Sequence, residues 1–168
     1  MKYKENELKQ GIKIHTINTN KFKTNLLAVF LTTELNRENV TKNAMIPAIL
    51  RRGSESMPTQ EAISREMEEM YGASFNCGVD KRGDNQVLKF YMETVNDNFL
   101  PDSSEKMLEK SIDKILEIIF KPVSVFFRRG AYALFKHFIY IGGVIYSQKL
   151  RHWLSILNGL KNRGVEDI

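Results

Sequence analysis

The chain has 168 residues, a length typical of one domain or of one domain with an appendage, and 42% of them are apolar, which excludes wholesale disorder. Its single cysteine, Cys77, excludes an internal disulfide and favours a reducing compartment. The net charge of +5 is confined to one end, because residues 122–168 hold 7 basic side chains, only 2 acidic ones and 8 aromatic ones. We therefore predict a domain at 1–121 and an unrelated basic, aromatic-rich extension at 122–168.

The first elements in the chain are two strands and a helix. Residues 11–17 alternate apolar and polar side chains, which is the pattern of a half-buried strand. Residues 26–31 form a continuous apolar run that suits a strand buried on both faces, although periodicity alone leaves a helix open. Residues 39–50 are predicted as a helix that Gly53 can end, with Pro47 inside it weakening or bending it.

A second helix, a pair of strands and a third helix follow. Thr59 is placed to cap the second helix, whose apolar stripe is Ile63, Met67 and Met70. Residues 73–79 and 87–94 are predicted as strands joined by a polar turn at 80–85.

The third helix gives the clearest helical pattern in the chain. Ser103 or Ser104 can cap it. Its apolar stripe comprises Leu108, Ile112, Ile115, Leu116 and Ile119. The resulting order, β-β-α-α-β-β-α, predicts an α+β fold with a mixed or antiparallel sheet and helices packed on one face.

Four short sequence segments, taken in chain order, resemble the first domain of the insulinase/pitrilysin family of zinc metallopeptidases. They are Gly11 to Ile14, Leu50 to Ser54, Met70 to Ala73 and the strand that carries Leu88, Phe90 and Met92. The resemblance covers about residues 8–122. It implies a truncated insulinase-type half-domain.

Active members of that family carry an inverted zinc motif, H-x-x-E-H, on the first helix. Two His side chains one helical turn apart bind the zinc ion, and the Glu acts as general base on the zinc-bound water. Aligned on Gly53, the motif positions hold Ala44, Pro47 and Ala48, none of which can bind zinc or accept a proton. The family's further Glu ligand would lie at or beyond the end of the resemblance. We therefore expect no catalytic residues, no metal and no cofactor, and we interpret residues 44–50 as a core-facing helix.

The run from Ala44 to Gly53 is similar to non-catalytic bacterial members of the family that pair with an active homologue, some of them linked to elongation factor P modification or peptide maturation. The resemblance implies a subunit that helps to form a chamber or holds a peptide. Two alternatives stay open: an active zinc metalloendopeptidase with unrecognised ligands, and the non-functional product of a pseudogene.

The last residues, 152–168, resemble a segment of mutator-type insertion-sequence transposases, from Trp153-Leu154 to Glu166-Asp167-Ile168. That family's catalytic Asp would lie beyond this point, so the resemblance implies no transposase activity. We hypothesise that a mobile element interrupted a peptidase-subunit gene and left a truncated product. Residues 138–146 are apolar but far shorter than the roughly 20 residues of a membrane span. The basic, aromatic-rich composition also suits a peripheral membrane helix or electrostatic contact with nucleic acid. We favour an unselected extension and expect no specific nucleic-acid binding.

Cys77 has two readings, a nucleophile or a buried structural residue, and we favour the second. A nucleophilic thiol needs a base beside it. His15 is the one His in residues 1–121, and nothing in the sequence brings it to Cys77, while His137 and His152 are isolated in the extension. The polar N-terminus carries no secretory signal, so we expect a cytoplasmic protein.

Overall fold

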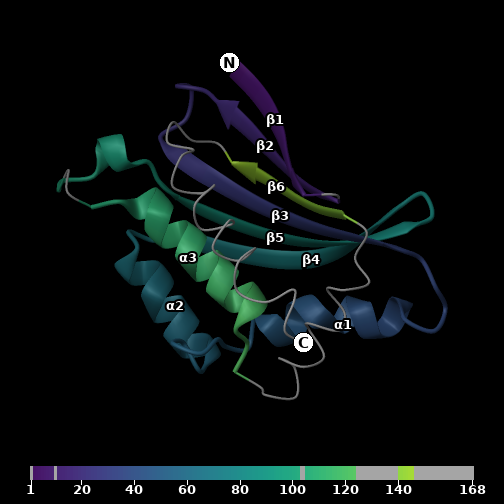
Figure 1. Ribbon diagram of the computed structural model, residues 1–168. Helices are drawn as coiled ribbons and strands as arrows, with labels where there is room; N and C mark the ends of the chain where they lie inside the picture. Colours follow the sequence, from purple (N-terminus) through teal and green to yellow (C-terminus); the bar gives the residue numbers. More distant parts are fainter. Residues whose placement is uncertain (1, 10, 103–104, 124–139, 146–168) are drawn as a thin grey trace.

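The computed structural model describes residues 2–9, 11–102, 105–123 and 140–145, in which a six-stranded sheet is covered on one face by three helices (Figure 1). The sheet has the order β1-β2-β6-β3-β5-β4. Its strands are β1 (Lys2–Lys9), β2 (Ile12–Asn18), β3 (Thr24–Glu34), β4 (Ser74–Arg82), β5 (Asn85–Val95) and β6 (Tyr140–Ile145). The helices are α1 (Val40–Leu50), α2 (Gln60–Glu69) and α3 (Met107–Phe120), with a short 3-10 helix at Asp97–Phe99.

Neighbouring strands are antiparallel except for β6, which runs parallel to β2 and antiparallel to β3. The hairpin between β4 and β5 turns on Gly83 and Asp84, because Arg82 pairs directly with Asn85. Gly83 has a φ of 58°, which is the left-handed conformation that such a two-residue turn needs and that glycine adopts most readily. The turn is therefore shorter than the predicted 80–85, because both strands extend further than their apolar patterns.

The core lies between the sheet and the helices. Side chains alternate along a strand, so every second residue of β3 and β5 faces the helices. The β3–β5 register then pairs these residues directly, as Leu27 with Met92, Val29 with Phe90 and Leu31 with Leu88. All six are buried, and the α3 residues packed on the same core include Ile112, Ile115, Ile118 and Ile119. Two strands and one helix thus form the centre of the fold.

The predicted α+β class, with a mixed sheet and helices on one face, is confirmed. The Thr59 cap is also confirmed, since its side-chain oxygen accepts the backbone N–H of Ala62 at 3.1 Å. The third helix begins later than predicted, at Met107, with Lys106 at the cap position. The predicted caps at 103–104 lie outside the described residues.

Two strands are additional to the predicted set. The first, β1, is polar along both faces and pairs with β2 at the sheet's edge. The second, β6, comes from the segment predicted as an extension and lies inside the sheet between β2 and β3 (Figure 1). Residues 152–168, with their transposase-like pattern, lie outside the described residues, so the separate origin of 122–168 stays a prediction.

Hydrogen bonds between polar groups, of which only Ser54 is fully buried, hold the loop after α1 to the end of α3. Ser54 donates its hydroxyl to Glu117 Oε1 at 2.7 Å, and the Ser56 backbone N–H donates to the same oxygen at 2.7 Å. Burial alone would raise the pKa of the Glu117 carboxyl, but the hydrogen bonds from Ser56 and Ser54 outweigh it and hold this pKa below its ordinary value. A Cβ at Gly53 would lie 2.6 Å from the Pro58 carbonyl oxygen, so the loop's close approach requires glycine there.

Replacing Glu117 with Gln is expected to lower the free energy of unfolding by about 1–2 kcal/mol at neutral pH, because two donors lose a charged acceptor. A carboxyl whose folded pKa is lowered contributes stability above its unfolded pKa and loses it as the pH falls through the folded value. The wild type and Glu117→Gln should therefore converge in stability in acid. Urea unfolding followed by circular dichroism at both pH values checks this, with Asp113→Asn, an exposed carboxylate on the same helix, as the control.

Candidate functional site

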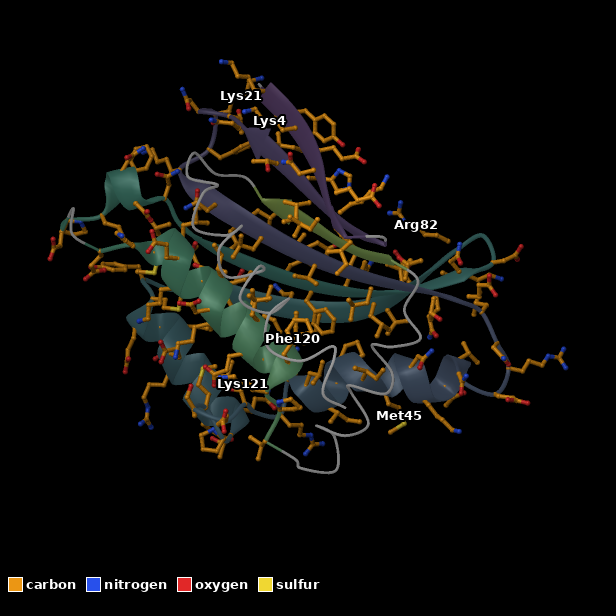
Figure 2. All side chains as sticks on the ribbon, viewed as in Figure 1. Lys4, Lys21, Met45, Arg82, Phe120 and Lys121 are labelled. Carbon is orange, nitrogen blue, oxygen red and sulfur yellow. The ribbon has the colours of Figure 1, made fainter. Side chains whose placement is uncertain are left out.

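Helix α1 presents the motif positions on two different faces. Its buried residues are Asn43, Ile46, Pro47 and Leu50, whereas Ala44 and Ala48 are exposed. The prediction of a core-facing helix over 44–50 is therefore wrong for the two alanines. Met45, beside Ala44, is 56% exposed and points away from the sheet (Figure 2). The helix is apolar on nearly every side, so its sequence alone did not identify the face that packs on the sheet.

The outward face of α1 has the spacing of a two-histidine zinc site but no ligand atoms. Ala44 and Ala48 lie four residues apart, so their side chains project from one side of the helix at successive turns. A methyl group offers no lone pair to a cation, and Pro47 between them has neither a side-chain donor nor a carboxylate. Within the part of the chain that the structure describes, no group of three or more His, Cys, Asp or Glu side chains could hold a metal ion. The described residues therefore offer no means of activating water here.

The inner face of α1 is held to the sheet by two side-chain hydrogen bonds to its backbone. Gln86 on β5 donates its amide Nε2 to the Val40 carbonyl at 2.9 Å, at the start of the helix. Cys77 on β4 donates its thiol to the Pro47 carbonyl at 3.3 Å, in the second half of the helix. Both bonds come from neighbouring strands, so they fix the position of α1 on the sheet, and with it the outward direction of Ala44 and Ala48.

Cys77 has a structural position, as the sequence indicated, although it is half-buried instead of fully buried. Burial raises the pKa of its thiol, and the nearby charge of Arg51 offsets this only in part. His15 lies on β2, where its Nδ1 is 2.8 Å from the Tyr3 hydroxyl, and β4 and β2 are separated by three other strands. The structure therefore does not bring the thiol and the imidazole together.

A shallow groove of about 310 Å³ lies beside the end of α1, between α2 and the first residues of β4. Ile63, Met67 and Phe75 form its apolar floor, and Arg51, Glu68 and Asn76 contribute polar groups. Strand β4 is the edge of the sheet on this side and pairs with β5 alone among the described strands. The sequence did not predict this groove, because it depends on how α2 packs against the edge strand.

Comparison with known proteins places these features in context. No family model matches the sequence. A curated relative, the "Probable inactive metalloprotease YmfF" of Bacillus subtilis (strain 168), is 34% identical over 120 residues, which span 70% of this chain and 28% of the relative. The chain thus spans little more than a quarter of that protein's length. The relative's name agrees with the prediction of a chain without peptidase activity.

Solved structures of similar fold include a conserved protein from Enterococcus faecalis V583, with 36% identity and a TM-score of 0.68 over 71% of this chain and 28% of that one. A peptidase M16 inactive domain from Pseudomonas fluorescens matches 73% of this chain and 27% of its own, with 16% identity and a TM-score of 0.55. Pitrilysin matches 94% of this chain and 22% of its own, with 12% identity and a TM-score of 0.63. The chain therefore has the fold of these peptidase M16 and pitrilysin structures.

Installing histidine at both alanine positions should create a zinc site, because the two side chains share one exposed face. In a Cys77→Ser background, Ala44→His/Ala48→His is expected to bind Zn²⁺ at least about tenfold more tightly than Ala44→His alone. Isothermal titration with zinc chloride measures this. Ala44→His/Met45→His is the matched control, since adjacent helix positions do not face each other. Equal affinity of the two double variants would contradict the assigned face.

The Cys77 thiol should react slowly in the folded protein, because it is half-buried and its raised pKa reduces the thiolate fraction. We expect iodoacetamide to alkylate it at least about tenfold more slowly at about pH 8 than in guanidinium. Val79→Cys in a Cys77→Ser background supplies an exposed thiol on the same strand for comparison. Folded-state reaction of Cys77 at the rate of this control would refute the structural assignment.

Proposed function

We propose that the chain is a non-catalytic, peptidase-like module that acts by binding, either as part of a subunit that pairs with an active zinc-peptidase homologue or as a surface that holds a peptide. The observation that carries the proposal is the outward face of α1. Ala44 and Ala48 are exposed at ligand spacing and have no ligand atoms, while Pro47 is buried against the sheet. The two metal-ligand positions, 44 and 48, are therefore available for contact but carry no group for catalysis.

The β4 edge supports the peptide-holding role. An edge strand presents unpaired backbone N–H and C=O groups, which can add an extended peptide as a further strand. The groove next to the first residues of β4 adds an apolar floor at Ile63, Met67 and Phe75, where a side chain of such a peptide could insert. Arg51 at the groove would favour an acidic group on the peptide. Backbone pairing thus supplies affinity, and the groove supplies preference for particular side chains.

The partner-subunit role rests on the apolar character of the same outward face. Met45 is 56% exposed and lies three residues before the exposed Ala48, so the two side chains are neighbours on α1 and form a small apolar patch. Buried apolar side chains at the centre of an interface provide much of its affinity. A homologue that retains the zinc motif is the partner that this resemblance implies.

The chain matches only part of the length of the curated relative. The chain spans 28% of the curated relative, and we propose that it forms one section of such a subunit. We also propose that a mobile element interrupted the gene, from the transposase-like pattern at 152–168. No helix in the described segments is long and apolar enough to cross a membrane. We propose a cytoplasmic location from the single cysteine, which suits a reducing compartment.

The purified chain is expected to retain no stoichiometric zinc after dialysis and to bind a purified homologue that carries H-x-x-E-H. Elemental analysis by mass spectrometry measures the metal, and biolayer interferometry measures the binding. Met45→Glu should weaken the interaction at least about tenfold, since it places a charge in the apolar patch. Asp113→Asn, on a different helix, is the control variant and should leave binding unchanged.

The possible outcomes separate the three candidate functions. One zinc ion per chain after dialysis would favour an active metallopeptidase with unrecognised ligands. Failure of the chain to unfold cooperatively, together with an absence of binding to the homologue, would favour a non-functional product. Either result would overturn the proposal.

A further inference from the structure

Strands β2 and β3 follow one another in the chain but do not pair with each other. A third strand, β6, lies between them, parallel to β2 and antiparallel to β3 (Figure 1, yellow-green). Its residues pair on both sides at once, so that Gly143 lies between Ile14 and Val29, and Val144 lies between His15 and Ala28. The two consecutive strands therefore form a slot that is one strand wide, and a segment from much later in the chain occupies it.

The slot pairs with the backbone of β6 on both sides. The paired residues of β6 include Gly142 and Gly143, which have no side chain to fit a particular pocket. Glycine in a strand interior also weakens the strand, because it gives up more conformational freedom on pairing than other residues do. Two ladders of backbone hydrogen bonds hold β6, and a second copy of the chain carries an identical segment that satisfies them equally well.

The slot can also close with the core side chains kept on their present face. If β6 leaves, β2 and β3 are antiparallel to each other and already joined by residues 19–23, so they can pair directly as a hairpin. The present register would then bring Ile14 beside Val29. Both residues belong to the helix-facing core cluster, so direct pairing leaves each side chain on its present face. Backbone groups released by β6 would thus be paired again, which lowers the cost of exchange.

From these three features we infer that the slot between β2 and β3 is a strand-acceptor site, and that its exchange partner is residues 140–145 of a second copy of this chain. Two chains that exchange β6 form a reciprocal dimer in which each strand makes the contacts that it makes within one chain. Such swapping is a low-cost route to dimers because it introduces no new kind of contact. The site lies on the opposite side of the sheet's centre from the β4 edge, so this inference is independent of the proposed peptide-holding surface.

Cysteine cross-linking between full-length copies tests the exchange. Lys13 and Gly142 are partners across β2 and β6, and neighbouring strands lie about 4.8 Å apart, within the reach of a disulfide. One copy carries Lys13→Cys and the other Gly142→Cys, both in a Cys77→Ser background. The two are mixed at high concentration, incubated, oxidised and analysed by non-reducing electrophoresis. We expect a covalent heterodimer whose yield rises with concentration.

Three variants make the outcome decisive. Replacing Lys13→Cys with Lys21→Cys, in the turn between β2 and β3 (Figure 2), should lose most of the heterodimer, since Lys21 is not a partner of β6. Adding Gly143→Pro to the donor copy should lower the yield at least about fivefold, because proline removes a ladder N–H and clashes in a central strand. A single chain with both Lys13→Cys and Gly142→Cys reports pairing within one copy. Disulfide formation only within that chain would overturn the exchange, and formation in neither arrangement would overturn the slot itself.

Discussion

The alternation of side chains along β3 and β5 is the constraint on which the rest of the structure depends. Their register places Leu27, Val29 and Leu31 beside Met92, Phe90 and Leu88, which makes one continuous apolar face. Each such side chain gains roughly 1.5–3 kcal/mol when it leaves water, so this face must be covered. Helices α1, α2 and α3 cover it, and the α1 residues that do so include Ile46 and Leu50. The opposite side of α1 is therefore directed outward, and the packing of the core leaves Ala44 and Ala48 exposed.

The elements with a strong period could be predicted from the sequence. The α3 stripe and the alternating residues of β5 each bury one face against a large neighbour, so pattern and packing agree. Thr59 could be identified because a cap is a local interaction between residues three apart. The ends of the strands were predicted less accurately. β4 and β5 pair with each other up to the Gly83–Asp84 turn, so both strands continue past the residues that show an apolar pattern.

The features that sequence reasoning missed depend on distant partners. Strand β1 is polar on both faces and is defined only by its pairing with β2. Strand β6 has two central glycines and no alternation, and its position is set by the space between β2 and β3. The candidate site shows the same limit, because the residues at the predicted motif positions could be read directly, whereas the side of α1 that faces solvent could not. That side is set by the packing of Ile46 and Leu50 in the core. The bonds from Gln86 and Cys77, which lie more than 25 residues away along the chain, hold the helix in this position.

The predicted motif positions 44, 47 and 48 differ in how easily the fold could accept a metal ligand or a general base. Positions 44 and 48 face solvent, so a ligand side chain there would meet no steric or solvation barrier. Position 47 is buried, and its carbonyl already accepts the Arg51 backbone N–H at 3.1 Å and the Cys77 thiol at 3.3 Å. A carboxylate at that position would have to leave water beside a half-buried thiol and a carbonyl dipole, and such burial is costly. A ligand side chain at position 44 or 48 would thus be a change at the surface, whereas a carboxylate at position 47 would disturb the packing of α1 on the sheet.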